Sequence, residues 1–460
     1  MRAVVGIMLG IAATLSLTTF DPALAAAPTG GKSLHVAIQR QLKQHDFAAA
    51  KDSAQELLNM EPDSVAAHVW LAKALYGLKE YKNASGEYSA AINLETDAAT
   101  KSRLLYDRAQ AEHFAQLYSE AVADFTTLIS SAPSVDLYLQ RASSFDGLGK
   151  QESAIADYSE AIKLQPSNPD LYLKRALLQK SMHNNDAALA DFNQAVKLRP
   201  SLVSWRATFH RDQGNSQGAI EDFSSAIATN KGCGKAAELC NRALVYADLD
   251  HHRKAIKDLS EALKIEPQRG DFFANRGSSY FGVADFKHSI SDFNEAVKLS
   301  PENADYIYKR AEAETSDGQR DAALKDYDEA IRLQKDQKES AMYLYRRGLV
   351  AAEMNKHNQA LDDLTKALAA DQDNAGFWYE RGIEYEATEH WKEAEGDFSK
   401  VVAMKPNFAP AFKHRAAVRA KAGDSAGAID DLKTSMQLYG DEKDMFGVAE
   451  VRRMIAKYSK

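Results

Sequence analysis

A five-residue motif recurs twelve times along this chain and constrains its fold more than any other feature. The motif starts with a small residue and ends with an acidic residue followed by an aromatic residue or leucine, as in AVADF at 121–125 and AIADY at 154–158. Two divergent copies begin at Ala50 and Ala84, and the last copy begins at Ala428. Successive copies start 31 to 37 residues apart, most often 34. A fixed period of this length is typical of repeat proteins.

Further residues keep the same register around the motif. The eleventh copy has Trp378, Gly382, Tyr385, Ala394, Phe398 and Pro406. In this pattern the chain resembles the tetratricopeptide repeat family, whose repeat is a helix–turn–helix unit of 34 residues. The resemblance covers residues 31 to about 440. It implies an all-α fold, a right-handed α-solenoid of about twelve repeats.

The period also gives the domain boundaries. Residues 1–25 are expected to be a signal peptide, 26–30 a short linker and 441–460 a C-terminal capping helix. The expected repeats span 31–64, 65–98, 102–134, 135–168, 169–199, 200–235, 236–269, 270–303, 304–337, 341–374, 375–408 and 409–440. Insertions after the sixth and ninth repeats, near Cys233 and Gln337, are candidate bends in the solenoid.

The residue pattern agrees with the packing that such repeats need. Two short helices cannot each bury an apolar stripe alone, so they pack on each other and on the next pair. Small residues such as Ala142 and Gly382 mark the places where helices approach closely. Asparagines precede three first helices, where they can accept hydrogen bonds from the helix start: Asn168, Asn303 and Asn374. Glycines lie in four turns, where a positive φ costs them little: Gly149, Gly214, Gly318 and Gly423.

One departure from the family pattern concerns charge. Ten consecutive repeats place arginine where the family has leucine, and the same ten carry an aspartate in the second helix. Because the two occur together, we expect a ladder of Arg–Asp pairs, in which each guanidinium meets a carboxylate through two parallel hydrogen bonds. The alternative is a site for an acidic ligand, but paired arginines have little left to offer one. The expected ladder consists of Arg108, Arg141, Arg175, Arg206, Arg242, Arg276, Arg310, Arg347, Arg381 and Arg415 with Asp124, Asp157, Asp191, Asp222, Asp258, Asp292, Asp326, Asp363, Asp397 and Asp431.

The N-terminus reads as a cleaved secretory signal. Arg2 supplies a positive start, residues 3–17 are a short apolar run, and Ala23-Leu24-Ala25 gives a small-x-small cleavage pattern. The run is shorter than the ~20 residues of a membrane-spanning helix, so we expect no integral membrane span after cleavage. The chain is therefore expected to be exported, either periplasmic or secreted.

The two cysteines, Cys233 and Cys240, have two interpretations. In an oxidising compartment they could form a disulfide that ties a loop at 232–234 to the next helix. Otherwise they are two reduced thiols, one exposed and one buried. A metal site is disfavoured, because two cysteines without further ligands do not complete a zinc shell.

Composition and motifs exclude several functions. The formal net charge of −8 disfavours nucleic acid, whose binding proteins carry a basic patch or stripe. The sequence contains no phosphate-binding loop, no nucleophile elbow and no His-Glu-x-x-His metalloprotease motif. We therefore expect no enzyme activity and no cofactor.

Binding is expected on the first helices, which in the resembling family line a concave groove that holds extended peptides or partner helices. The position that usually faces this groove is tyrosine in four repeats: Tyr106, Tyr308, Tyr345 and Tyr379. Tyrosine offers contact area with a polar tip, although these rings could simply pack between neighbouring first helices. The leading function is thus an exported scaffold for protein partners. The alternatives are a self-associating structural solenoid and an accessory subunit of envelope polysaccharide or peptidoglycan machinery.

The chain ends with a segment that fits a capping helix. Phe446, Val448, Val451, Ile455 and Tyr458 fall near one helical face and predict its buried side. Solenoids need such a terminal element with a polar outer face, which basic residues supply here: Arg452, Arg453, Lys457 and Lys460.

Overall fold

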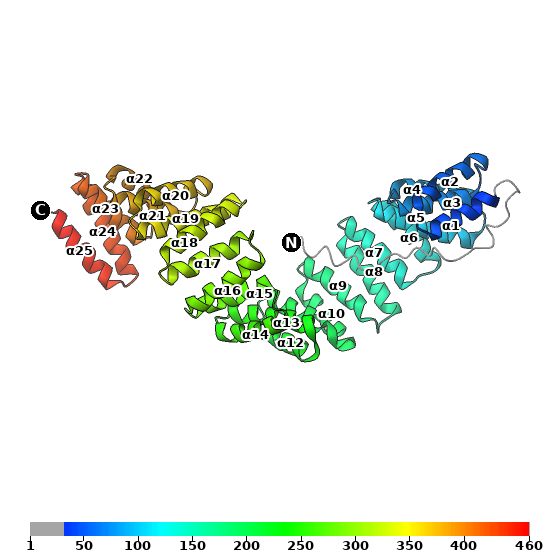
Figure 1. Ribbon diagram of the computed structural model, residues 1–460, viewed down its shortest axis with the longest axis horizontal. Helices are drawn as coiled ribbons and strands as arrows, with labels where there is room; N and C mark the ends of the chain where they lie inside the picture. Colours follow the sequence, from blue (N-terminus) through cyan, green and yellow to red (C-terminus); the bar gives the residue numbers. More distant parts are fainter. Residues whose placement is uncertain (1–31, 460) are drawn as a thin grey trace. The chain divides into compact units, whose positions relative to one another are not determined.

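The computed structural model describes residues 32–459, and all of the regular secondary structure in that range is helical. The helices follow one another in the helix–turn–helix order expected of a tetratricopeptide-type α-solenoid (Figure 1). The expected signal peptide at 1–25 and the linker at 26–30 lie outside the described residues. No helix within the described range is long and apolar enough to cross a membrane.

The described chain divides into two units. The first extends to Phe209 and contains α1 (Lys32–Lys43), α2 (Phe47–Met60), α3 (Val65–Gly77), α4 (Tyr81–Leu94), α5 (Ala98–Phe114), α6 (Tyr118–Ser131), α7 (Val135–Gly147), α8 (Gln151–Leu164), α9 (Pro169–Ser181), α10 (Asn185–Leu198) and the 3₁₀ turn η3 (Pro200–Leu202).

The second unit begins at His210, inside α11 (Val203–Asp212). It continues through α12 (Ser216–Thr229), α13 (Gly232–Asp248), α14 (His252–Ile265), α15 (Gly270–Gly282), α16 (Phe286–Leu299), α17 (Ala304–Ser316), α18 (Arg320–Leu333), α19 (Gln337–Glu353), α20 (His357–Ala370), α21 (Ala375–Ala387), α22 (Trp391–Met404), α23 (Ala409–Lys421), α24 (Ser425–Asp441) and α25 (Met445–Tyr458).

Tight turns join the two helices of each repeat, and one residue in each turn has a positive φ. The four glycines expected there, including Gly149 (φ 68°) and Gly423 (φ 93°), adopt this conformation. Other repeats use residues with a side chain, such as Ala284 (φ 58°), at a cost of about 1–2 kcal/mol for an L-residue. The expected N-caps are also present, since Asn168, Asn303 and Asn374 each accept a backbone hydrogen bond from the start of the following helix.

Small and aromatic residues build the core of each repeat. Ala142 and Ala154 are fully buried where the two helices of the fourth repeat cross, and Tyr158 packs beside them. In the eleventh repeat, a methyl group added to Gly382 would stand 2.8 Å from the ring of Phe398. Because real side-chain atoms do not approach this closely, a larger residue there would overpack the contact by roughly 1–3 kcal/mol.

Three first helices, α5, α13 and α19, have 17 residues where most have 13. The insertions near Cys233 and Gln337 therefore form an extra helical turn at the start of α13 and α19. Each of the three follows a second helix that lacks the closing proline found after most others. Since proline disfavours helical backbone in the residue before it, its absence lets the next helix begin earlier.

This extra turn overturns the expected disulfide. Cys233 and Cys240 both lie on α13, and both thiols are free. Seven residues of helix, at ~1.5 Å each, separate their Cα atoms by about 10 Å, and a disulfide requires less than ~7 Å. The predictions of a disulfide and of a loop at 232–234 were therefore wrong. Cys233 is exposed and Cys240 is buried.

The C-terminal helix α25 packs on α24, and its Glu450 accepts a hydrogen bond from Lys413 Nζ of α23 at 3.1 Å. Val451 is fully buried against α24, with Val448, Ile455 and Tyr458 partly buried around it. The expectation for Phe446 was wrong, because its side chain is 76% exposed. It lies in the first turn of α25, on the side that α24 does not cover.

Candidate functional site

The structure brings together nine of the ten expected Arg–Asp pairs. In the fourth repeat, Arg141 Nε donates to Asp157 Oδ2 at 2.9 Å and Arg141 Nη2 donates to Asp157 Oδ1 at 2.6 Å. The same two-bond contact joins 108–124, 175–191, 242–258, 276–292, 310–326, 347–363, 381–397 and 415–431. The pair of Arg206 with Asp222 spans the boundary between the two units and stays a prediction.

A third partner holds each ladder arginine, and sequence reasoning missed it. Arg175 Nη1 donates at 2.8 Å to the hydroxyl of Ser159, which lies on the second helix of the preceding repeat. All ten arginines make this contact, to Ser89, Thr126, Ser159, Asn193, Ser224, Ser260, Asn294, Asp328, Thr365 and Ser399 in chain order. The sequence carried the signal, since a short polar residue follows the aromatic residue or leucine of the motif in each of these repeats. The last repeat has no arginine after it, and there Lys433 takes the place.

These contacts favour a structural role for the ladder over an acidic-ligand site. The ladder aspartates are buried, except for the partly buried Asp326. The pairing with Asp157 raises the pKa of Arg141, so its guanidinium stays charged. In each of the nine pairs, all three nitrogens of the guanidinium are already hydrogen-bonded within the chain. Removing one partner of such a buried pair costs about 3–5 kcal/mol, because it leaves an uncompensated charge.

Two glutamates interrupt the regular surroundings of the ladder. Four residues after the arginine, several repeats carry an aromatic ring, as in Tyr280, whose centroid lies 5.9 Å from the Arg276 guanidinium. Glu112 and Glu314 take that place in the third and ninth repeats. Both are buried, and neither Oε2 atom has a hydrogen-bond partner. Burial, with repulsion from the ladder aspartate as the next cause, raises the pKa of each to about 7.

The four expected groove tyrosines lie on first helices and pack against their neighbours. In the first unit, Tyr106 donates to Asp136 Oδ2 at 2.8 Å. In the second unit, Tyr308 stacks on Tyr343 with ring centroids 4.2 Å apart and is only 8% exposed. Burial, followed by the charge of Glu312, raises the pKa of Tyr308 beyond its usual range. Tyr308 is therefore mainly a packing residue.

Tyr345 and Tyr379 keep more accessible surface and are half-buried. Tyr345 packs on Phe377, with centroids 4.8 Å apart, and Tyr379 contacts the ring of Phe408 at 5.3 Å. One helical turn after each tyrosine lies a half-buried aliphatic residue, Leu349 or Ile383. We call the surface formed by Tyr345 and Leu349 of α19 with Tyr379 and Ile383 of α21 the α19–α21 face.

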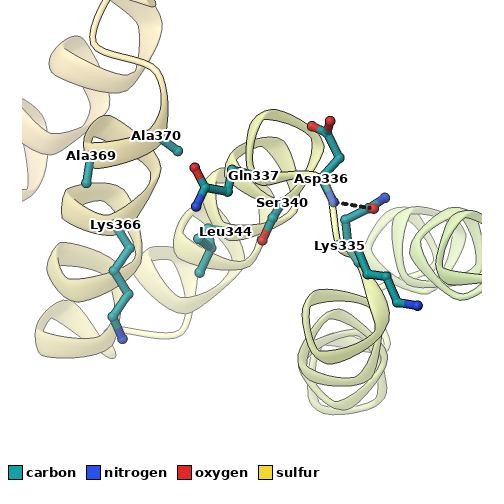
Figure 2. A pocket seen from close by; sticks show the side chains of 9 residues that line it. Lys335, Asp336, Gln337, Ser340, Leu344, Lys366, Ala369 and Ala370 are labelled. Atoms are coloured by element: carbon teal, nitrogen blue, oxygen red, sulfur yellow. Dashed lines mark hydrogen bonds between the residues drawn. The ribbon is translucent and has the colours of Figure 1, made fainter.

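A shallow pocket of about 310 Å³ lies elsewhere in the tenth repeat, between the start of α19 and the end of α20 (Figure 2). Leu344 and Ala370 line its apolar part. Two of its charged groups already have partners, since Lys366 Nζ donates to Asp362 at 2.6 Å and Asp336 accepts from two backbone amides of α19. Within residues 32–459, no three His, Cys, Asp or Glu side chains are placed to hold a metal ion.

The helix order and the ladder define an α-solenoid repeat protein. Family models described as tetratricopeptide repeat match residues 36–102, 173–232, 239–269, 274–340 and 345–407, and a TPR repeat model matches 148–182. These segments cover more than half of the sequence. The chain belongs to the tetratricopeptide repeat family.

Solved structures show partial likeness. MamA (41-end) from Desulfovibrio magneticus RS-1 is 18% identical, with a TM-score of 0.36 over 37% of this chain and 96% of its own. YrrB, described as a TPR protein with an unusual peptide-binding site, is 15% identical, with a TM-score of 0.37 over 42% and 97%. The Cut9–Hcn1 hetero-tetramer of the APC/C is 13% identical, with a TM-score of 0.41 over 97% and 99%. Comparison with curated proteins yields no match.

Proposed function

We propose that this protein is an exported scaffold that binds a peptide or helix of a partner protein on its first helices. Solenoids of stacked helix pairs use such extended surfaces for binding, and the family assignment gives this chain the same architecture. The observation that carries the proposal is the α19–α21 face, where two half-buried tyrosines alternate with two half-buried aliphatic residues. Export rests on the sequence of residues 1–25.

The ladder supports this function by limiting the motion of the helices. Each arginine joins three helices, so neighbouring repeats hold one another in register. A surface that is already ordered loses less conformational freedom when a partner binds, which improves affinity without further contacts. Tyrosine side chains add to this, because they have few rotatable bonds for the area they present.

The test places bulk on the face without removing any packing. Ala352 lies about one helical turn after Leu349 on α19 and is partly exposed, and Ala387 lies one helical turn after Ile383 on α21 and is exposed. A double variant, Ala352→Arg with Ala387→Arg, is compared with Ala369→Arg on the outer helix α20, where the alanine is also exposed. Residues 26–460 of each form are used to capture partners from the cell envelope. A partner that the parent and Ala369→Arg retain, and that the double variant loses, supports the proposal; equal capture by all three refutes it.

Export is tested separately. Residues 1–25 joined to a reporter enzyme should direct it out of the cytoplasm, and the Arg2→Glu form should not. If both reporters stay in the cytoplasm, the export part of the proposal fails while the binding part stands.

One observation favours self-association as a second function. Met445 and Phe446 are 71% and 76% exposed side by side in the first turn of α25. Adjacent exposed apolar side chains of this kind are typical of contact sites. If the protein self-associates here, sedimentation should show a dimer or larger species that Phe446→Ser converts to a monomer; a parent that is monomeric at high concentration excludes this function.

A further inference from the structure

In the tenth and twelfth repeats, the residue before the ladder arginine joins the repeat to the one before it. In the tenth repeat, Arg346 Nε lies 3.7 Å from Glu312 Oε1 of the ninth. In the twelfth repeat, His414 Nδ1 lies 2.7 Å from Glu386 Oε2 of the eleventh. In both cases a basic side chain meets an acid on the preceding first helix, so the contact neutralises a carboxylate.

The eleventh repeat breaks this arrangement, because the equivalent residue is Glu380. The preceding first helix offers Leu349 where Glu312 stands one repeat earlier, so the charge pair of the tenth repeat has no counterpart here. The charge of His414, on the following first helix, acts on Glu380 without forming an ion pair with it. Glu380 is half-buried, and it forms no hydrogen bond or ion pair with another residue of the described range. Within residues 32–459, the chain therefore leaves one carboxylate of the α19–α21 face without a hydrogen-bonded or ion-paired partner.

The other charges of α21 do not compensate Glu380. Arg381 is bonded to Asp397 at 2.7 and 2.9 Å. Glu384 is paired with His357, at 2.8 Å, and Glu386 with His414, at 2.7 Å. Among the charged residues of α21, three glutamates, Glu380, Glu384 and Glu386, outnumber the single Arg381, so this helix carries net negative charge.

The environment of Glu380 makes an approaching cation favourable. Burial raises its pKa, and the charge of Glu384 adds to the rise while His414 opposes it. Glu380 also lies close to both tyrosines of the face: burial raises the pKa of Tyr345 and of Tyr379, and in each case the charge of Glu380 is the next cause. A cation here would gain a poorly solvated carboxylate and, beside it, the ring of Tyr379, which attracts positive charge. The ring of Tyr345 already has the Arg346 guanidinium 6.0 Å from its centroid, so it adds mainly contact area.

We propose that the α19–α21 face binds a lysine or arginine side chain of the partner, held by the Glu380 carboxylate beside Tyr345 and Tyr379. The occupant is a segment of a partner protein in which this basic residue is flanked by apolar residues. Its apolar side chains would cover Leu349 and Ile383, and its charge is complementary to the acids of α21. This inference rests on the proposed function and specifies the chemistry of its partner.

The experiment is a selection of random nine-residue peptides displayed on phage, carried out with residues 26–460 of the parent, of Glu380→Gln and of Glu380→Lys. Glu393→Gln is the matched control, because Glu393 is an exposed acid on α22 of the same repeat. All four forms are first compared by circular dichroism and thermal unfolding. Because the Glu380 carboxylate has no partner in the described range, its removal should leave the helix content unchanged and the thermal midpoint unchanged or slightly higher.

The parent and Glu393→Gln should enrich lysine or arginine at one position at least five-fold over the unselected library. Glu380→Gln should lose this enrichment and keep the apolar preference around it, and Glu380→Lys should select acidic residues at that position. Peptides selected without a basic preference, or a basic preference unchanged in Glu380→Gln, would overturn this inference and leave the proposed function standing. If the folded parent selects no peptide at all, both proposals fail.

Discussion

The buried glutamates beside the ladder give the sharpest prediction, and it concerns stability as a function of pH. Glu112 and Glu314 have a pKa of about 7 in the folded protein, against an ordinary value of 4.5. Between these two values the folded state holds a proton that the unfolded state has released. The free energy of unfolding therefore falls as pH rises through this window. Each glutamate should lower the free energy of unfolding least below pH 4.5 and most above pH 7.

The size of the effect follows from the two pKa values. A rise from 4.5 to about 7 corresponds to about 3 kcal/mol, at ~1.4 kcal/mol per pKa unit. Water that reaches the site raises its effective dielectric constant, so we expect a measured gain of about 1–3 kcal/mol for Glu112→Gln at pH 8 and almost none at pH 4.5. Glutamine keeps the acceptor oxygen that Ser85 Oγ contacts at 3.1 Å, so the substitution removes little besides the charge.

A local measurement suits this chain, since long repeat arrays do not always unfold in one step. Amide hydrogen exchange, resolved by peptide mass spectrometry, gives the free energy of opening of α5 and α17 separately. Glu112→Gln should slow exchange in α5 at pH 8, Glu314→Gln should slow it in α17, and Glu152→Gln, at an exposed position of α8, should change neither. A loss of protection of the same size at every pH would refute the reasoning, because it would mean that the effect of these glutamates on the fold does not depend on their ionisation.

Four further predictions concern single positions. Asp157→Ala should lower the free energy of unfolding of its repeat by about 3–5 kcal/mol. A loss below 0.5 kcal/mol in the same exchange experiment would show that the Arg–Asp pairs do not stabilise the fold. Ser159→Ala deletes the third contact of Arg175 and the hydrogen bond that the Ser159 hydroxyl donates to Ile155 O at 2.7 Å, and it should cost about 1 kcal/mol. A loss as large as that of the aspartate would contradict the division of roles. Cys233 should be alkylated in the native protein and Cys240 only after unfolding, with an unchanged mass before and after reduction, whereas a gain of two mass units on reduction would restore the disulfide. Ala284→Gly should raise the thermal midpoint, since relief of a positive φ worth about 1–2 kcal/mol exceeds the entropic cost of glycine; a lower midpoint would exclude strain in that turn.

Patterns that repeat within one period of the chain could be predicted from the sequence. The register of the motif gave the helix pairs, and the joint occurrence of arginine and aspartate predicted contacts that the structure contains. The third contact of the arginines was not predicted, because it depends on how one second helix packs against the next repeat. The extra turn of α13 was not predicted, because the glycines around Cys233 suggested a loop. What permits the helix is that no proline follows α12, and such an absence is easily overlooked.

Features that depend on a single repeat were harder to predict. Phe446 has the right spacing for the buried face of a capping helix, yet in the first turn of α25 it is Gly447 that packs against Tyr439 of α24, and the ring of Phe446 is exposed. Glu380 looks like any other surface acid in the sequence. Only comparison with the contacts of Arg346 and His414 shows that this carboxylate lacks the partner its neighbours have.

The ladder has a consequence for how many repeats such a protein can contain. Each arginine and its aspartate lie within a single repeat, and the third contact is to a residue type that every repeat from the second to the eleventh supplies. Gain or loss of one whole period therefore leaves every buried charge with a partner. A deletion that ends inside a period, between the arginine and its aspartate, leaves one of the two without its partner. Because each repeat contacts only its neighbours, the length of the array can change in whole repeats without redesign of its interior.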